Sequence, residues 1–87
     1  METIKKAGLI TALSNMNKVL EFGQKKYPKN DWATYAPEKH LQAILRHLGK
    51  GEALDEETGL PHAAHAAARC LMLLGVILQR GADGPKL

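Results

Sequence analysis

Cysteine and aromatic residues are scarce in this sequence, and their scarcity excludes several classes of protein. The chain of 87 residues has a single cysteine, Cys70, so it cannot form an internal disulfide. Only 5% of the residues are aromatic, whereas 45% are hydrophobic, which predicts a small aliphatic core. A chain of this length has room for one core, so we expect a single helical domain over residues 1–87. Multidomain enzymes and disulfide-built toxins are therefore excluded.

Sequence motifs for covalent catalysis are also absent. The chain contains no glycine-rich phosphate-binding loop, no nucleophile elbow and no Cys-x-x-Cys pair. Cys70 lies in an apolar stretch, which is typical of a small buried thiol. If the chain is an enzyme, we expect its nucleophile to be a water molecule activated by a metal ion or a base.

No segment has the uninterrupted apolar run of a signal peptide or a membrane span. The N-terminal stretch is broken by polar residues, and the most apolar segment, residues 63–78, contains His65 and Arg69. As a helix this segment would measure about 24 Å, against about 30 Å for the hydrocarbon core of a bilayer. We therefore expect a cytoplasmic protein without a membrane partner, whose apolar segment packs within a bundle or against a second subunit.

Hydrophobic residues recur with the period of an α-helix in three segments, and no segment alternates with the period of a strand. The spacing predicts three helices and a flexible C-terminal tail, at about residues 3–26, 37–48, 61–80 and 81–87. Pro28 ends the first helix, Pro37 is suited to the first turn of the second, and Gly49 ends the second. The sequence thus predicts an all-α fold with three helices in each protomer.

The net charge of +3 is unevenly distributed along the chain. The first 29 residues carry six lysines and two glutamates, whereas residues 52–57 carry four carboxylates and no basic residue. Proteins that bind nucleic acids usually present a continuous basic surface, and the acidic segment interrupts any such surface here. Nucleic acid is therefore not an expected partner, and the lysines are either solvated or attract phosphate groups.

The acidic segment carries residue types that bind hard cations. Glu52, Asp55 and Glu57 lie just before the third predicted helix. Neighbouring carboxylates repel one another unless a cation neutralises them, and their oxygens suit Mg²⁺, Mn²⁺ or Ca²⁺. The segment is therefore a candidate metal site, and a solvated approach to a helix is the alternative interpretation.

Three of the four histidines adjoin this segment. His62 and His65 are three residues apart, so they share one face of the predicted helix, and His47 lies near the end of the preceding helix. The spacing lacks the cysteines or the His-Glu-x-x-His arrangement that zinc sites favour. The histidines are candidate catalytic groups or, alternatively, hydrogen-bonded residues of the core.

Three of the four aromatic residues lie between the first and second predicted helices. These are Tyr27, Trp32 and Tyr35, in an otherwise polar segment. Nucleobases stack on aromatic rings with about 1–3 kcal/mol per base, which favours a nucleotide-binding role. The alternative is that Trp32 covers the small core.

These motifs together resemble the small phage dATP/dGTP diphosphohydrolase family, which belongs with the all-α, MazG-like nucleotide pyrophosphatases. The resemblance covers about residues 19–77. It is carried by four segments: Leu20 to Tyr27, Asn30-Asp-Trp32, Arg46-His47, and the block Gly51-Glu52-x-x-Asp55-x-Glu57-x-Gly59-Leu60 with His62-x-x-His65-Ala66.

The resemblance implies hydrolysis of a purine deoxynucleoside triphosphate to the monophosphate and pyrophosphate, in the host cytoplasm if the chain is encoded by a phage. It implies that acidic side chains hold Mg²⁺ or Mn²⁺ and that a water molecule attacks the α-phosphorus. It also implies a MazG-like bundle completed by oligomerisation, as a homodimer or homotetramer. By position, the metal ligands would be Glu52, Asp55 and Glu57, and His62 and His65 would support those ligands, bind the metal themselves or act as bases. The substrate-binding residues would be Lys26, Tyr27, Trp32 and Arg46. We count His47, His62 and His65 as the candidate catalytic residues.

One departure from the MazG-like pattern leaves other functions open. Those enzymes usually place a Glu-Glu-x-x-Glu motif on an early helix, where this chain has only Glu21. An alternative hypothesis is therefore a non-catalytic, phage-type helical oligomer that binds or sequesters nucleotides or inhibits a host protein. A third is an interaction module whose apolar third helix is the interface.

Overall fold

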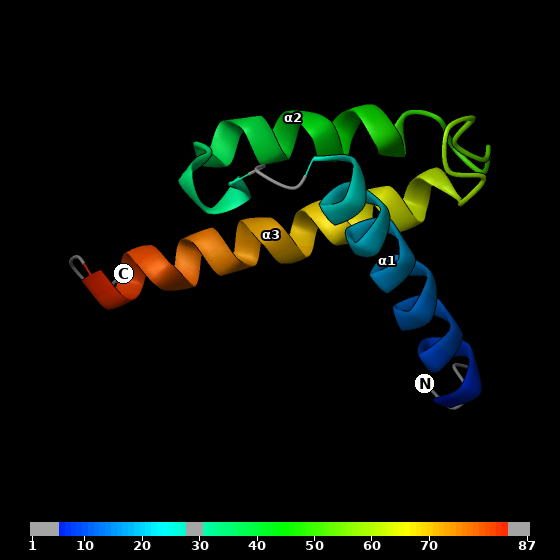
Figure 1. Cartoon of the computed structure of the whole chain (residues 1–87), viewed down its shortest axis with the longest axis horizontal. Helices are drawn as coiled ribbons and strands as arrows, with labels where there is room; N and C mark the ends of the chain where they lie inside the picture. The colour runs from blue at the N-terminus through cyan, green and yellow to red at the C-terminus, as the bar shows by residue number, and fades with distance from the viewer. Residues whose placement is uncertain (1–5, 28–30, 84–87) are drawn as a thin grey trace.

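The regular secondary structure of the chain is helical throughout the part that is described. A computed structural model describes residues 6–27 and 31–83 (Figure 1). It contains three α-helices and one short 3-10 helix: α1 at Lys6–Lys26, η1 at Trp32–Thr34, α2 at Pro37–Leu48 and α3 at His62–Asp83. Within the described ranges the nearest approach to a strand is an isolated bridge between Leu54 and Pro61. The predicted all-α fold with three helices is confirmed.

The helix ends follow from proline and glycine, with one difference from the expected boundaries. Helix α2 begins at Pro37, and the backbone N–H of Gly49 donates to the Leu45 carbonyl at its end. Helix α3 continues to Asp83, past its expected end at Arg80, because Gly81 lowers helix propensity by about 1 kcal/mol without stopping the helix. The expected helical residues 3–5 and the tail residues 84–87 lie outside the described residues.

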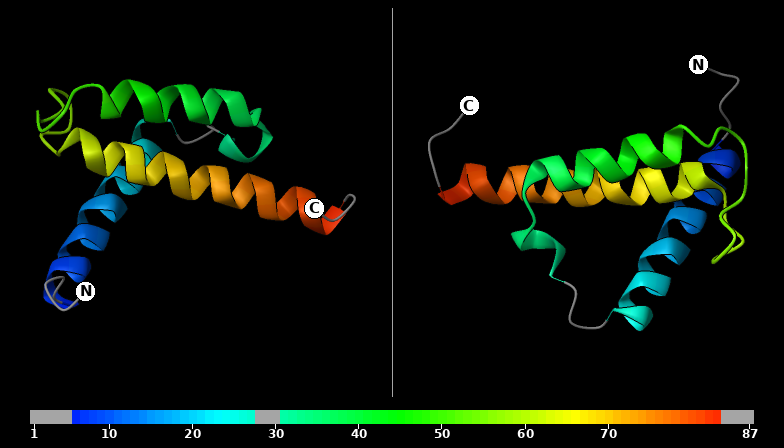
Figure 2. Two further views of the ribbon diagram at one scale, coloured as in Figure 1. Left: turned by 180° about the vertical axis from the view of Figure 1, so that it is seen from behind. Right: turned by 90° about the horizontal axis from the view of Figure 1, so that it is seen from above.

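Helix α3 is the element that the others contact. Helices α2 and α3 run antiparallel and side by side, joined by the loop of residues 49–61 (Figures 1 and 2). Helix α1 contacts α3 and crosses it steeply, and its N-terminal end projects away from the α2–α3 pair (Figure 1). The turn η1 also packs on α3. The site described below therefore lies at the loop end of the α2–α3 pair.

Small side chains allow α2 and α3 to pack closely. The buried hydrophobic residues are on these two helices and are mostly alanines: Ala43, Ile44, Ala64, Ala66, Ala68 and Val76. Trp32 closes the other end of the pair against Gly75, where an added Cβ would lie 3.0 Å from the indole ring. Helix α1 contributes no buried residue. The core is therefore aliphatic, as expected, and Trp32 covers part of it.

Large apolar side chains remain uncovered on all three helices. The accessible surface is 6675 Å², whereas a compact protein of this mass is expected to expose about 5,000 Å². The exposed groups include three on α1, three on α2 and four on α3: Leu9, Ile10, Leu13, Leu41, Leu45, Leu48, Leu71, Leu74, Ile77 and Leu78. Each of the three helices thus presents large apolar side chains to solvent.

Helix α3 is longer than the apolar segment, residues 63–78, whose helical length was compared above with the thickness of a bilayer. Its 22 residues measure about 33 Å, and by length and composition alone the segment His62–Gly81 suffices to cross a membrane. A core helix satisfies the same test. Its N-terminal half is bound into the fold, because His62, His65 and Arg69 hydrogen-bond to other elements.

Candidate functional site

The loop between α2 and α3 is shaped by the carboxylate of Asp55. Its Oδ1 accepts hydrogen bonds from the backbone N–H groups of Glu57 and Thr58, at 2.8 and 2.9 Å. The loop closes when the Asp55 N–H donates to the Leu60 carbonyl at 2.8 Å, and Gly59 supplies the positive φ of 73° that this turn requires. Local residues alone therefore aim the Asp55 side chain toward the start of α3.

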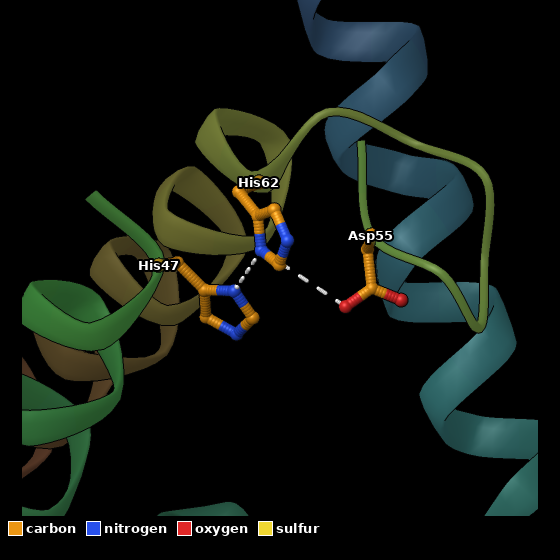
Figure 3. A group of neighbouring side chains, drawn as sticks. All are labelled: His47, Asp55 and His62. Carbon is orange, nitrogen blue, oxygen red and sulfur yellow. Dashed lines mark hydrogen bonds and ion pairs between the residues drawn. The ribbon is translucent and has the colours of Figure 1, made fainter. Parts of the chain in front are cut away.

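Two histidines meet in front of this carboxylate (Figure 3). His47 comes from the last turn of α2 and His62 is the first residue of α3, and their Nδ1 atoms lie 2.8 Å apart. Asp55 Oδ2 lies 4.0 Å from His62 Nδ1. Ligand atoms of His47, Asp55 and His62 all fall within 4.8 Å of one another, and we name this group the His/Asp triad.

His65 lies beside the triad. Its Nε2 is 2.8 Å from the Thr58 hydroxyl and 4.0 Å from Asp55 Oδ1, and its ring stacks on that of His47 with centroids 4.8 Å apart. The Thr58 hydroxyl accepts the backbone N–H of Leu60 and donates to Asp55 Oδ1 at 3.4 Å, so it links His65 to the carboxylate. Three of the four histidines thus gather around one carboxylate.

The surroundings favour the neutral forms of His47 and His65 and the charged form of Asp55. Burial lowers the pKa of His47, and the charges of His65, Arg46 and His62 lower it further. Burial also lowers the pKa of His65, although Asp55 opposes this. The hydrogen bond from the Thr58 backbone is the largest effect on Asp55 and lowers the pKa of its carboxyl group. Near neutral pH His47 and His65 therefore offer imidazole lone pairs next to a negative oxygen.

The triad has the donor atoms of a transition-metal site. Imidazole nitrogens suit ions such as Mn²⁺, Fe²⁺, Co²⁺ and Zn²⁺, whereas Mg²⁺ prefers oxygen ligands. Bonds of about 2.1 Å place neighbouring ligand atoms about 3.0–3.4 Å apart. The two Nδ1 atoms already approach this spacing, and Asp55 Oδ2 would need to move by about 1 Å. The residues present therefore fit an ion with mixed nitrogen and oxygen ligands.

The other two predicted metal ligands lie outside the triad. Glu57 forms an ion pair with Lys26 at the end of α1, and both side chains are partly exposed. Glu52 is exposed near the start of the loop. Of the three predicted carboxylates, the described structure brings only Asp55 to the histidines.

The predicted substrate-binding residues are divided between two places. Tyr27 and Trp32 line a cavity of about 340 Å³ between α1 and α3, together with Leu20, Gly23, Gln24, Leu71 and Met72. Arg46 is exposed on α2, next to His47. The Lys26–Glu57 ion pair connects the end of α1 that lines the cavity with the loop that carries Asp55. Trp32 thus both covers the core and faces a cavity.

Sequence reasoning did not identify His40 and Arg69 as site residues. His40 is fully buried, and its Nδ1 accepts a hydrogen bond from Arg69 Nε at 3.0 Å. Two spacings could have indicated them. His40 precedes His47 by seven residues on α2, and Arg69 follows His65 by four on α3, so each shares a helix face with the triad or its neighbour.

The fold and the site define an all-α domain with a cluster of metal-ligating side chains and an adjacent cavity. Comparison with known families identifies the family within this class. The family model described as "dATP/dGTP diphosphohydrolase, N-terminal" matches residues 2–84. The chain belongs to this family, and the resemblance inferred from its motifs is confirmed.

One relative extends well beyond the matched region. The "dATP/dGTP diphosphohydrolase" of Salmonella phage PMBT28 is 38% identical over 66 residues, which are 72% of this chain and 23% of the relative. The chain therefore spans about a quarter of the length of that protein. No solved structure matches the chain.

The lowered histidine pKa values predict that acid destabilises the metal-free protein. Below pH 6.5 the unfolded chain binds more protons than the folded chain at His47 and His65, so the free energy of unfolding falls as the pH falls. Urea titrations at fixed protein concentration, from about pH 7.5 to about pH 5.5, measure this dependence. The His47→Gln and His65→Gln variants should show a weaker dependence. A stability that is constant or rises toward pH 5.5 would contradict the electrostatic description.

Proposed function

We propose that this domain takes part in metal-dependent hydrolysis of purine deoxynucleoside triphosphates to monophosphate and pyrophosphate. The observation that carries the proposal is the convergence of His47, Asp55 and His62 on one point. Membership of the dATP/dGTP diphosphohydrolase N-terminal family supports the substrate class. Hydrolysis of a phosphoanhydride depends mainly on positioning and charge neutralisation, which such a site supplies.

The triad would hold the metal ion. Of the two ions that the sequence predicts, Mn²⁺ suits the two imidazole nitrogens better than Mg²⁺. When bound, the ion would supply positive charge to phosphate oxygens and a more acidic water molecule. His65 lies outside the triad, and its lowered pKa keeps it neutral, so it is the group best placed to accept a proton.

The cavity beside α1 would receive the purine base. Its volume of about 340 Å³ has room for a bicyclic ring, and Tyr27 and Trp32 offer aromatic faces on which the ring can stack. Lys26 directly precedes Tyr27 and is paired with Glu57 rather than with an anion from solution. A phosphate group that approached this position would compete with Glu57 for the ammonium group.

We also propose that the domain functions as a homodimer or homotetramer. The apolar groups left on its surface include Leu41, Leu45 and Leu48, which share one face of α2 at spacings of four and three residues. All three are about half exposed, and the total surface exceeds that of a compact protein by roughly a third. A second copy would remove these side chains from water.

A non-catalytic nucleotide-binding role is the second candidate. It is favoured by one observation, the separation of Glu52 and Glu57 from Asp55, which leaves a single carboxylate in the triad. In that case the protein would be stabilised by a deoxynucleotide without added metal and would release no pyrophosphate.

Pyrophosphate release from dATP and dGTP tests the catalytic proposal. With Mn²⁺ we expect turnover by the 87-residue chain, and a loss of about 100-fold or more in Asp55→Asn and His62→Gln, because each removes one ligand. Glu56→Gln is the matched control, since this exposed carboxylate in the same loop lies outside the triad. Absence of turnover with every dNTP and either ion, or full activity in Asp55→Asn, would overturn the proposal.

Sedimentation equilibrium at micromolar concentration tests the oligomer. We expect a species of at least twice 9.5 kDa, and a shift toward the monomer in Leu45→Lys, which places charge on the apolar face of α2. Gln42→Lys adds the same charge to a polar exposed position on that helix and should leave the mass unchanged. A 9.5 kDa monomer, or partition of the chain into membranes, would contradict association.

A further inference from the structure

His40 is a fully buried histidine whose two ring nitrogens both have partners. Its Nε2 lies 3.0 Å from the backbone carbonyl oxygen of Trp32, and its Nδ1 lies 3.0 Å from Nε of Arg69. A carbonyl can only accept a hydrogen bond, so Nε2 carries the proton and Nδ1 presents its lone pair to the guanidinium group. His40 therefore fixes the position of Arg69 as a neutral acceptor and does not neutralise its charge.

Arg69 is a partly buried cation for which the described part of the chain supplies no carboxylate partner. Among the described residues, no carboxylate lies within ion-pair distance of Arg69 or of Arg46. Burial lowers the pKa of Arg69 and the positive charge of Arg46 lowers it further, whereas Tyr35 opposes this shift. A partly buried charge that no carboxylate neutralises is costly, so an anion from solution would stabilise Arg69.

The position of the two arginines relates them to the triad. Arg69 lies on the face of α3 that carries His62 and His65, at seven and four residues from them. Arg46 directly precedes His47 on α2. Nε of Arg69 donates to His40, and a guanidinium group also carries two terminal amino groups whose fork geometry suits phosphate.

We propose that Arg69, held by His40 and assisted by Arg46, binds the terminal phosphates of the triphosphate next to the His/Asp triad. This inference rests on the proposed function for the identity of the ligand, a polyphosphate. The substrate and the pyrophosphate product share this chemistry. Arg69 contacts the phosphates, and His40 is a positioning residue that acts through Arg69.

Calorimetric titration with inorganic pyrophosphate in metal-free buffer tests the site without turnover. We expect Arg69→Gln to weaken binding by about tenfold or more, because it removes charged donors. Arg80→Gln, an exposed arginine on the same helix, is the matched control and should bind as the unmodified chain does. Equal affinity in Arg69→Gln and the unmodified chain, or no binding by either, would overturn the proposal.

Two further comparisons identify the ligand and the role of His40. A non-hydrolysable α,β-imido analogue of dATP should bind more weakly to Arg69→Gln, whereas deoxyadenosine should bind both proteins equally. An equal loss for both ligands would contradict phosphate recognition. His40→Leu should weaken pyrophosphate binding and His40→Gln should restore it, since an amide can both accept from Arg69 and donate to Trp32. If His40→Leu does not fold, His40→Gln and Arg69→Gln decide the matter.

The outcomes separate this inference from the proposed function. Pyrophosphate binding that depends on Arg69, in a protein without turnover, would support the anion site and reject catalysis. Turnover with an unchanged KM in Arg69→Gln would support catalysis and reject the anion site.

Discussion

The carboxylate of Asp55 is the group on which both the loop and the site depend. One of its oxygens accepts two backbone N–H groups and thereby folds residues 55–58 into a turn. The other oxygen is left to face His62, at 4.0 Å (Figure 3). The same side chain both makes the turn and faces the histidine. A substitution of Asp55 therefore changes the conformation of the loop as well as the candidate metal site. Thr58 extends this coupling, since its backbone binds Asp55 and its hydroxyl contacts His65.

The packing of the helices explains why the site lies where it does. Alanines bring α2 and α3 close together, so the last turn of α2 and the first turn of α3 place His47 and His62 in contact. The outer leucines of α2 remain exposed, and α3 is the one described helix that α1 contacts. The site is thus supported by the best packed pair of helices, while the remaining apolar surface is available to a second copy of the chain.

Local features of the sequence predicted local structure well. Hydrophobic periodicity and Pro37 located the three helices, and the spacing of His62 and His65 placed both beside the loop that carries Asp55. The unpredicted contacts join residues far apart in the chain: Lys26 with Glu57 and His40 with Arg69. These pairs depend on how α1 and α2 lie against α3, which helical periodicity does not specify. Glu52, Asp55 and Glu57 were predicted to bind one metal ion because they are close in sequence. In the folded loop the Glu57 side chain instead pairs with Lys26.

A titration with Co²⁺ is the sharpest test of whether His47, Asp55 and His62 form one metal site. Cobalt is a spectroscopic probe for sites of mixed nitrogen and oxygen ligands, and its visible absorption reports the ligands without any catalytic step. We expect saturation at one equivalent per chain, with a spectrum distinct from that of the aqueous ion, and loss of this signal in His62→Gln but not in Glu56→Gln. A spectrum identical to that of aqueous Co²⁺, or one unchanged by His62→Gln, would contradict it.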